Sequence, residues 1–233
     1  MDGNPELQRT NILNADLRFE TYRKGAQYFA GSVFYKRFKN PIEQVFNNAQ
    51  GAGTRNFQWR NVPSAIDLGV ELEYRLKLSR IAAALRDVTF FGNLSYIHSD
   101  VDVSQIAGAQ DRPLFGQSPY LVNGGLSYDN ADLGLSATVL VNRIGRRLWV
   151  VGQDQYLHTW ENPRTVLDCQ LVKKIGQNAE LKLTVGDILN QAAVFYQDQN
   201  DNGKFDEKGD TKIVSQRFGT NVTLGFNYNF GKN

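Results

Sequence analysis

The sequence contains one long segment in which every second residue is apolar, and this alternation constrains the fold more than any other feature. In residues 66–78 the even positions are all apolar, for example Leu68, Val70 and Leu72, and the odd positions carry glycine or charged side chains. Successive side chains of a β-strand point to opposite faces, so the segment has one apolar and one mostly charged face. A strand of a soluble protein has about 5 to 6 residues, whereas a strand that crosses a bilayer needs about 9 to 11. The segment therefore predicts a membrane-spanning strand.

The same alternation occurs at both ends of the chain. Leu13, Leu17 and Phe19 alternate with polar residues near the start, and the even positions of residues 222–230 are apolar near the end. Weaker versions of the pattern lie in residues 27–38, 88–101, 120–128, 133–142, 165–173 and 179–189. We therefore predict an all-β chain of about nine antiparallel strands.

The connections between the predicted strands are alternately short and long. Short links are expected at residues 23–25, 129–132 and 174–178, with a moderate one at 79–87, and long polar links at 40–59, 102–119, 143–164 and 190–212. Outer-membrane barrels join their strands by short periplasmic turns and longer extracellular loops, whereas a soluble Greek-key sandwich has no such order. The sequence therefore predicts a segment of an antiparallel transmembrane β-barrel.

The composition agrees with this prediction and argues against other classes of protein. The chain has 12% aromatic residues, 21 Gly and only 6 Pro, which favours strands and tight turns. Its mean hydropathy of -0.43 is compatible with a barrel, because lipid-facing and lumen-facing residues average out. The chain has 26 basic and 24 acidic residues, so it has no large excess of positive charge that would attract nucleic acid. We therefore expect no nucleic-acid partner. The single Cys169 excludes an internal disulfide framework.

Nine strands are an odd number, whereas single-chain bacterial barrels close with an even number. The first residues, MDGNPELQRTN, also lack the basic and apolar regions of a secretory signal. We therefore expect residues 1–233 to be the C-terminal part of a larger outer-membrane barrel. Two alternatives stay open: a self-contained small barrel (an adhesin or membrane enzyme) with a tenth strand inside a long link, and a soluble β-sandwich that binds Ca²⁺ or glycan.

Several motifs, in order along nearly the whole chain, resemble those of the TonB-dependent receptors, in particular the receptors of Bacteroidetes. They are GNPELQRTNILNADLRFE, YKRFKNPIEQV, NVPSAIDLGVELEYR (with the pattern N-x-x-x-A-x-x-x-G-x-E-x-E), LSYIHSDV, RPLFGQSPYLVNGGLSYDN and PRTVLDCQLVKKIGQNAELKLTVGDILNQ. The resemblance implies a large barrel, of about 22 strands in plugged transporters, that imports a scarce nutrient such as a siderophore, vitamin or glycan.

The resemblance also implies the partners of the chain. Residues 1–233 would supply roughly the last nine strands, surrounded by outer-membrane lipid and completed by the N-terminal barrel and plug of the same protein. We expect neither the plug domain nor a signal peptide within these residues. TonB, the inner-membrane partner that powers import, would contact only the absent plug region.

One polar segment, DQNDNGKFDEKGD, has the spacing of an EF-hand calcium loop. Asp198, Asn200, Asn202 and Asp206 stand at its positions 1, 3, 5 and 9, and Gly203 stands at position 6. Position 12 is Gly209, so the usual bidentate Glu is missing unless Asp210 or Glu207 replaces it. The segment therefore predicts either a weak Ca²⁺ site or a solvated Asn-Gly turn.

Aromatic residues near the strand ends are typical of the two girdles of a membrane barrel. Trp149, Tyr156 and Trp160 lie instead in a predicted long link. They are candidates for a platform on which a sugar ligand stacks, and the alternative is ordinary packing within the loop.

No other cluster indicates chemistry. Arg143, Arg146 and Arg147 could contact lipopolysaccharide phosphates or an anionic ligand, or could form a solvated loop. His98 and His158 are far apart, and no motif of the G-x-S-x-G kind supplies a nucleophile. We therefore predict no enzymatic activity.

Overall fold

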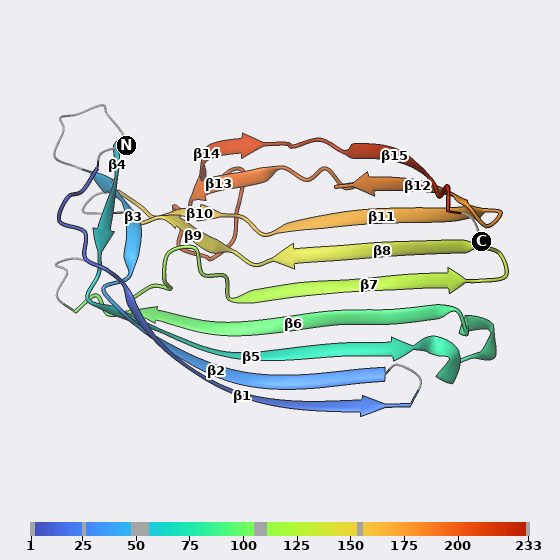
Figure 1. The fold of residues 1–233 in the computed structure, drawn as a ribbon. Helices are drawn as coiled ribbons and strands as arrows, with labels where there is room; N and C mark the ends of the chain where they lie inside the picture. Colours follow the sequence, from blue (N-terminus) through green and yellow to red (C-terminus); the bar gives the residue numbers. More distant parts are fainter. Residues whose placement is uncertain (1–2, 25–26, 48–55, 105–110, 153–155, 232–233) are drawn as a thin grey trace.

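The computed structural model describes residues 3–24, 27–47, 56–104, 111–152 and 156–231. Nine strands in this part of the chain form a single antiparallel sheet, each pairing with the next one along the sequence (Figure 1). They are β1 (Asn11–Arg23), β2 (Gln27–Lys39), β5 (Ser64–Lys77), β6 (Val88–Val101), β7 (Tyr120–Asn130), β8 (Leu135–Ile144), β11 (Arg164–Ile175), β12 (Ala179–Gly186) and β15 (Asn221–Tyr228). The prediction of about nine antiparallel strands is confirmed.

In two strands a residue with positive φ ends the extended backbone before the alternation predicts. β8 begins at Leu135, not at residue 133, since Gly134 has φ +55° in the preceding turn. β12 ends at Gly186, not at residue 189, since Asp187 has φ +50°. The left-handed region interrupts a strand in both places.

The short links all lie at one end of the sheet, on the right of Figure 1. Two single 3₁₀ turns, η1 (Leu78–Arg80) and η2 (Ala83–Leu85), make up most of the β5–β6 link. Tight turns join β7 to β8 and β11 to β12, and the second contains Gly176 at φ +65°. The β1–β2 turn includes residues 25 and 26, which lie outside the described residues.

The long links lie at the opposite end, where six short strands form two small sheets. β3 (Ile42–Asn47) and β4 (Asn56–Asn61) form a hairpin. β9 (Arg147–Val150), β10 (Thr159–Glu161), β13 (Ala193–Gln197) and β14 (Thr211–Gln216) form a four-stranded sheet in the order β14-β13-β10-β9. We call these six strands, with residues 111–119, the outer-loop assembly. The long links are therefore more ordered than their polar sequence predicts.

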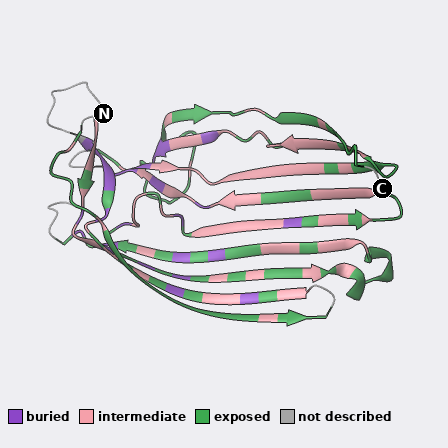
Figure 2. Cartoon of the chain, viewed as in Figure 1, coloured by how far each residue is buried: buried purple, intermediate pink, exposed green. Residues whose placement is uncertain are grey.

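The register places the apolar positions of all nine strands on one face of the sheet, because paired residues share a face. On β5, Leu68 is 55% exposed and the adjacent Asp67 only 3%. Leu17 of β1 and Leu224 of β15 are likewise exposed, and Figure 2 shows exposed segments along most strands. We call this the apolar face and its opposite the polar face. A β-sandwich buries the apolar faces of two sheets against each other, so the soluble-sandwich alternative is wrong.

The two edges of the sheet are β1 and β15, which do not pair with each other in the described part of the chain. The six short strands form ladders only among themselves. None of them supplies the tenth strand that a self-contained small barrel would need. Among the described residues, no helix is long and apolar enough to cross a membrane.

Burial is concentrated where the sheet meets the outer-loop assembly. One cluster combines Val62, Ala65, Val101 and Val103 at the loop ends of β5 and β6. A second cluster, inside the assembly, combines Val45, Leu148 and Val151 with Trp160 packed against them. The first cluster, against which Leu114 also packs, holds residues 111–119 to the sheet, and the second joins the outer loops to each other.

Candidate functional site

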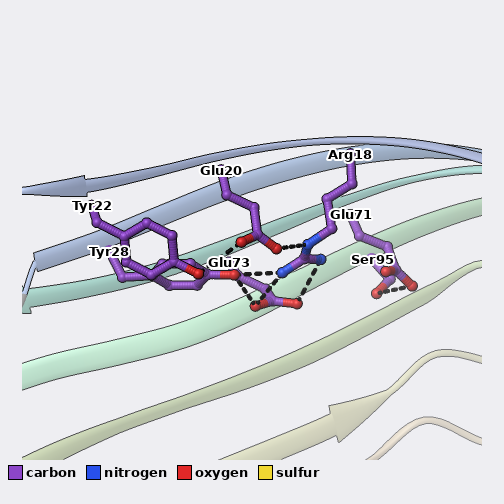
Figure 3. A network of polar contacts seen from close by, with 7 residues as sticks. All are labelled: Arg18, Glu20, Tyr22, Tyr28, Glu71, Glu73 and Ser95. Carbon is purple, nitrogen blue, oxygen red and sulfur yellow. Dashed lines mark hydrogen bonds and ion pairs between the residues drawn. The ribbon is translucent and has the colours of Figure 1, made fainter.

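The polar face carries a charged network that ties three strands together (Figure 3). The Arg18 guanidinium of β1 donates to both oxygens of Glu73 on β5, at 3.1 and 3.0 Å. Arg18 also donates to Glu20 and to the hydroxyl of Tyr28 on β2, and that hydroxyl donates to Glu73 at 3.2 Å. The Tyr22 hydroxyl donates to Glu20 at 2.7 Å. Arg18 is thus the cationic partner of both Glu20 and Glu73.

The contacts of its residues explain the motif N-x-x-x-A-x-x-x-G-x-E-x-E. Asn61 accepts from the Gln8 amide and donates to the Asn40 carbonyl, each at 2.8 Å, so it joins the start of the chain to the end of β2. Ala65, Gly69, Glu71 and Glu73 follow on the polar face of β5. Ala65 packs in the buried cluster, and Glu71 and Glu73 accept from Ser95 and Arg18.

Gly69 is required by a close approach of β2. A Cβ atom on Gly69 would lie 2.3 Å from Cζ of Phe34, far inside van der Waals contact. The tip of the Phe34 ring therefore lies over the glycine, and the Phe34 side chain is buried there. The motif glycine thus makes room for an aromatic ring.

Three asparagines continue the polar face across β6, β7 and β8. The Asn123 amide donates to Asn93 at 2.7 Å, and the Asn142 amide donates to Asn123. The register places Asn93 opposite Glu73, so the ladder and the charged network lie at one level of the sheet. We call Arg18, Tyr28, Glu73, Asn93, Asn123 and Asn142 the polar belt. A hollow on this face is lined by belt residues together with Asp168.

A buried ion pair fastens the outer-loop assembly. The Arg112 guanidinium donates to both oxygens of Glu43 on β3, each at 2.6 Å, and both side chains are at most 3% exposed. The Phe115 amide also donates to Glu43, at 3.2 Å. This bidentate pair joins two of the quoted motifs, NPIEQV and RPLFGQ, which the sequence shows as separate segments.

The backbone makes a second connection between the same loops. The amides of Phe46 and Gly116 donate to the carbonyls of Val151 and Leu148, and the Val151 amide donates to the carbonyl of Gln44. The three links that follow β2, β6 and β8 therefore pack as one unit.

The residues predicted to bind calcium lie in the turn between β13 and β14. Asp198 is 7% exposed, and its carboxylate forms an ion pair with Arg146 at 2.9 Å. The same carboxylate accepts from the backbone amides of Asn202 and Gly203, at 3.2 and 2.9 Å. The predicted ligand at position 1 of the calcium loop is thus already bound to a cation and to two amides.

The side chains of two other predicted ligands also accept hydrogen bonds from backbone amides of the turn. Asn202 accepts from the Lys204 amide at 2.8 Å, and Asp206 accepts from the Lys208 amide at 3.0 Å, while Asn200 lies beside Asp206 near Gly209. The described residues contain no group of three His, Cys, Asp or Glu side chains that could hold a metal. In this arrangement Arg146 occupies the carboxylate of Asp198, and calcium binding stays a prediction.

The three predicted stacking residues fall into two separate clusters. Trp149 and Tyr156 belong to a row of five rings, Tyr156–Phe46–Phe57–Trp149–Phe195, whose neighbouring centroids are 4.6–6.2 Å apart. Trp160 lies elsewhere, since it pairs with Leu148 across β9 and β10. The Arg146 guanidinium covers the Trp160 ring at 3.9 Å, and His158 meets its edge.

The loops supply partners for all three residues of the basic cluster, and two of these partners are carboxylates. Arg146 pairs with Asp198, and Arg147 pairs with Glu161. Arg143 donates to Thr165 at 2.7 Å and to Tyr120 at 3.3 Å. These contacts favour a structural role over binding of an external anion.

The two histidines lie in different surroundings. His98 is exposed on the apolar face of β6, whereas His158 accepts from the Gly152 amide through Nδ1 at 2.9 Å. Burial, with the charges of Arg112 and Arg146, lowers the pKa of His158 from 6.5 to about 4. His158 is therefore neutral near pH 7.

Glu43, Arg112 and the three belt asparagines are missed by reading single segments of the sequence. Each depends on a partner on another strand or link, so no local spacing identifies it. The sequence could have pointed to Glu43 and Arg112 only because both lie inside motifs that resemble those of the TonB-dependent receptors.

Comparisons with known proteins agree with this architecture. The family model described as TonB dependent receptor-like, beta-barrel matches residues 1–188. No curated protein sequence matches the chain. Similar solved structures include a mutant of the ferric enterobactin receptor PfeA from Pseudomonas aeruginosa (17% identity, TM-score 0.61), covering 94% of this chain and 31% of that one. The copper transporter OprC has 15% identity and a TM-score of 0.65, and the match covers 96% of this chain and 32% of OprC. The ferric yersiniabactin uptake receptor FyuA from Yersinia pestis has 14% identity and a TM-score of 0.57, and the match covers 94% of this chain and 29% of FyuA.

At these identities the solved structures show the fold alone. The chain spans less than a third of the length of each of these three. The family model covers most of the chain, and the single sheet with one apolar face agrees with it. The chain therefore belongs to the TonB-dependent receptor-like β-barrel family.

Proposed function

We propose that this chain forms part of the wall and the outer loops of an outer-membrane receptor that imports a scarce nutrient. The observation that carries the proposal is the arrangement of all nine strands, with apolar side chains on one face, polar side chains on the other and every long link at one end. Such a wall is stable where lipid covers the apolar face. The family consists of transport receptors of the outer membrane, not enzymes, in agreement with the prediction of no enzymatic activity.

The two unpaired edges indicate what completes the wall. We propose that further strands of the same protein pair with β1 and β15, and that the polar belt faces an N-terminal plug through which TonB acts. A belt of amides and paired charges supports this proposal, since it offers hydrogen bonds without a net field. The likeness of the motifs to Bacteroidetes receptors stays a prediction.

The ligand is proposed to be a siderophore, a vitamin or a glycan held over the pore by the outer loops. The solved relatives are named for ferric enterobactin, copper and ferric yersiniabactin. The row of rings supports a flat ligand or a sugar face, because Tyr156 is 39% exposed at one end of the row.

Uptake by the full-length protein tests the proposal. The protein would be produced in the outer membrane of a host without receptors of its own, and given a labelled ferric siderophore, cobalamin or oligosaccharide, with and without TonB. We expect one ligand to accumulate only when TonB is present. Correctly inserted protein that imports none of the three would contradict the proposal.

A paired variant tests the proposed platform. Trp149→Ala with Tyr156→Ala should weaken uptake of the imported ligand by about tenfold, as expected for the loss of stacking contacts worth about 0.5–1.5 kcal/mol each. Tyr35→Ala, which removes a ring from the apolar face of β2, is the matched control and should leave uptake unchanged. An equal loss of uptake in the double variant and in Tyr35→Ala would mean that both act through folding and not through ligand stacking.

A further inference from the structure

The apolar face of β2 changes character toward the loop end of the sheet. Its side chains are Phe29, Val33 and Tyr35 along the strand, followed by two cations, Arg37 and Lys39. A strand inside the apolar band has no reason to end on this face in two adjacent charges. The change therefore marks a boundary on the surface of the wall.

The neighbouring strand locates this boundary. On β5 the apolar positions run from Ile66 to Leu76, which is a rise of about 33 Å along the strand. A tilt of about 40° reduces this rise to about 25 Å, the height of the apolar band of a membrane barrel. Arg37 pairs with Ile66 and Lys39 with Ser64. Both cations thus lie at the edge of the band, one β-strand repeat apart.

Arg37 and Lys39 are exposed, and in the part of the chain that the structure describes neither forms an ion pair. On β6, Asp100 lies at the level of Arg37 and is separated from it by Ile66 of β5. Asp102 follows at the level of Lys39, and its amide donates to the carbonyl of Ser64. A hollow opens beside the two cations, and its lining includes Asn11, Leu13, Pro63 and Ser64. The lining thus combines two cations without ion pairs among the described residues, the amide of Asn11 and the hydroxyl of Ser64 with the apolar side chains of Leu13 and Pro63.

We propose that Arg37 and Lys39 bind the phosphate of an anionic lipid in the outward-facing leaflet. The inference rests on the proposed function, because it needs the apolar face to contact lipid and the long links to be extracellular. The guanidinium of Arg37 matches two phosphate oxygens, and Lys39 adds a second charge beside it. Leu13 lies opposite Arg37 on β1, and Tyr35 lies one repeat further into the apolar band, where the first acyl carbons of such a lipid would pass.

Charge complementarity selects this occupant. An apolar partner would leave two cations without counter-ions, and an acidic protein would have to reach into the headgroup layer of the membrane. A lipid phosphate reaches the hollow from the bilayer itself, with its acyl chains on the exposed apolar face.

The test compares the full-length protein in phosphatidylcholine nanodiscs that contain lipid A, a bisphosphorylated glycolipid, or dephosphorylated lipid A. Bound lipid is measured by native mass spectrometry and titration. The variant with Arg37→Gln and Lys39→Gln should bind lipid A about thirtyfold more weakly, because it loses the attraction of two cations to an anionic headgroup. Lys36→Gln, on the polar face of the same strand, should bind like the parent protein.

Each outcome decides between named causes. Dephosphorylated lipid A should bind the parent protein as weakly as lipid A binds the double variant, and inorganic phosphate should not compete. Equal binding by parent and double variant, or equal loss in Lys36→Gln, would overturn the inference. Unfolding midpoints of all variants show whether any loss reflects folding. Failure of the proposed function would appear separately, as absent uptake by the unaltered protein.

Discussion

Single residues on the polar face control how closely β2 and β5 approach each other. Gly69→Ala should destabilise the folded protein by about 1–3 kcal/mol, because the new methyl group overlaps the buried Phe34 ring. Gly31→Ala is the matched control, since its Cβ would lie 3.6 Å from Leu72, an ordinary contact. Denaturant unfolding of the full-length protein in lipid gives both values. Equal stability of the two variants would show that the ring moves aside freely.

His158 makes the outer-loop assembly sensitive to acid. Above pH 6.5 the imidazole is neutral whether the loops are packed or opened, so it contributes no pH dependence. Between pH 6.5 and about 4 only the opened loops bind a proton, so stability falls as the pH falls, by up to about 3 kcal/mol. Hydrogen exchange of β9 and β10 across this range measures the effect. His158→Gln should abolish the slope and His98→Gln should keep it; the reverse result would assign the titration to another group.

At the scale of elements, the buried ion pair between β3 and residues 111–119 should dominate the order of the outer loops. Arg112→Met leaves the Glu43 carboxylate buried without its partner, which should cost about 3–5 kcal/mol of local stability. Glu207→Gln breaks the exposed pair with Lys212 and should change stability by less than about 1 kcal/mol. Loss of amide protection in β3 after the first change, and not after the second, is the expected result. Equal protection would mean that the apolar cluster alone holds the hairpin.

Arg146 and calcium compete for the turn between β13 and β14. Because the guanidinium occupies Asp198, any Ca²⁺-dependent protease protection of residues 190–212 should be weak in the parent protein and stronger in Arg146→Gln. Asp198→Ala should show no calcium effect and is the control. Calcium protection that is equal with and without Arg146 would contradict this competition.

The nine wall strands could be predicted because their signal is local, with apolar side chains at every second residue. β9 and β10 have only four and three residues, too few for an alternation, and they form through partners on distant links. The arrangement of the predicted stacking residues likewise depends on partners on distant links. Trp149 and Trp160 look like neighbours in sequence, but Trp160 shares a face with Leu148, so Trp149 points to the other side. The belt asparagines carry no local signal at all.

For the molecule as a whole, the proposed function requires lipid to cover the apolar face of the nine-stranded sheet. Leu72 lies on that face in the middle of β5, and Glu71 beside it lies on the polar face. The decisive measurement is the free energy of unfolding, from lipid vesicles, of the full-length protein with Leu72→Arg or with Glu71→Arg. We predict a loss of about 2–4 kcal/mol for Leu72→Arg, as for an arginine near mid-bilayer, and a much smaller change for Glu71→Arg. Equal losses, or a larger loss for Glu71→Arg, would contradict the account.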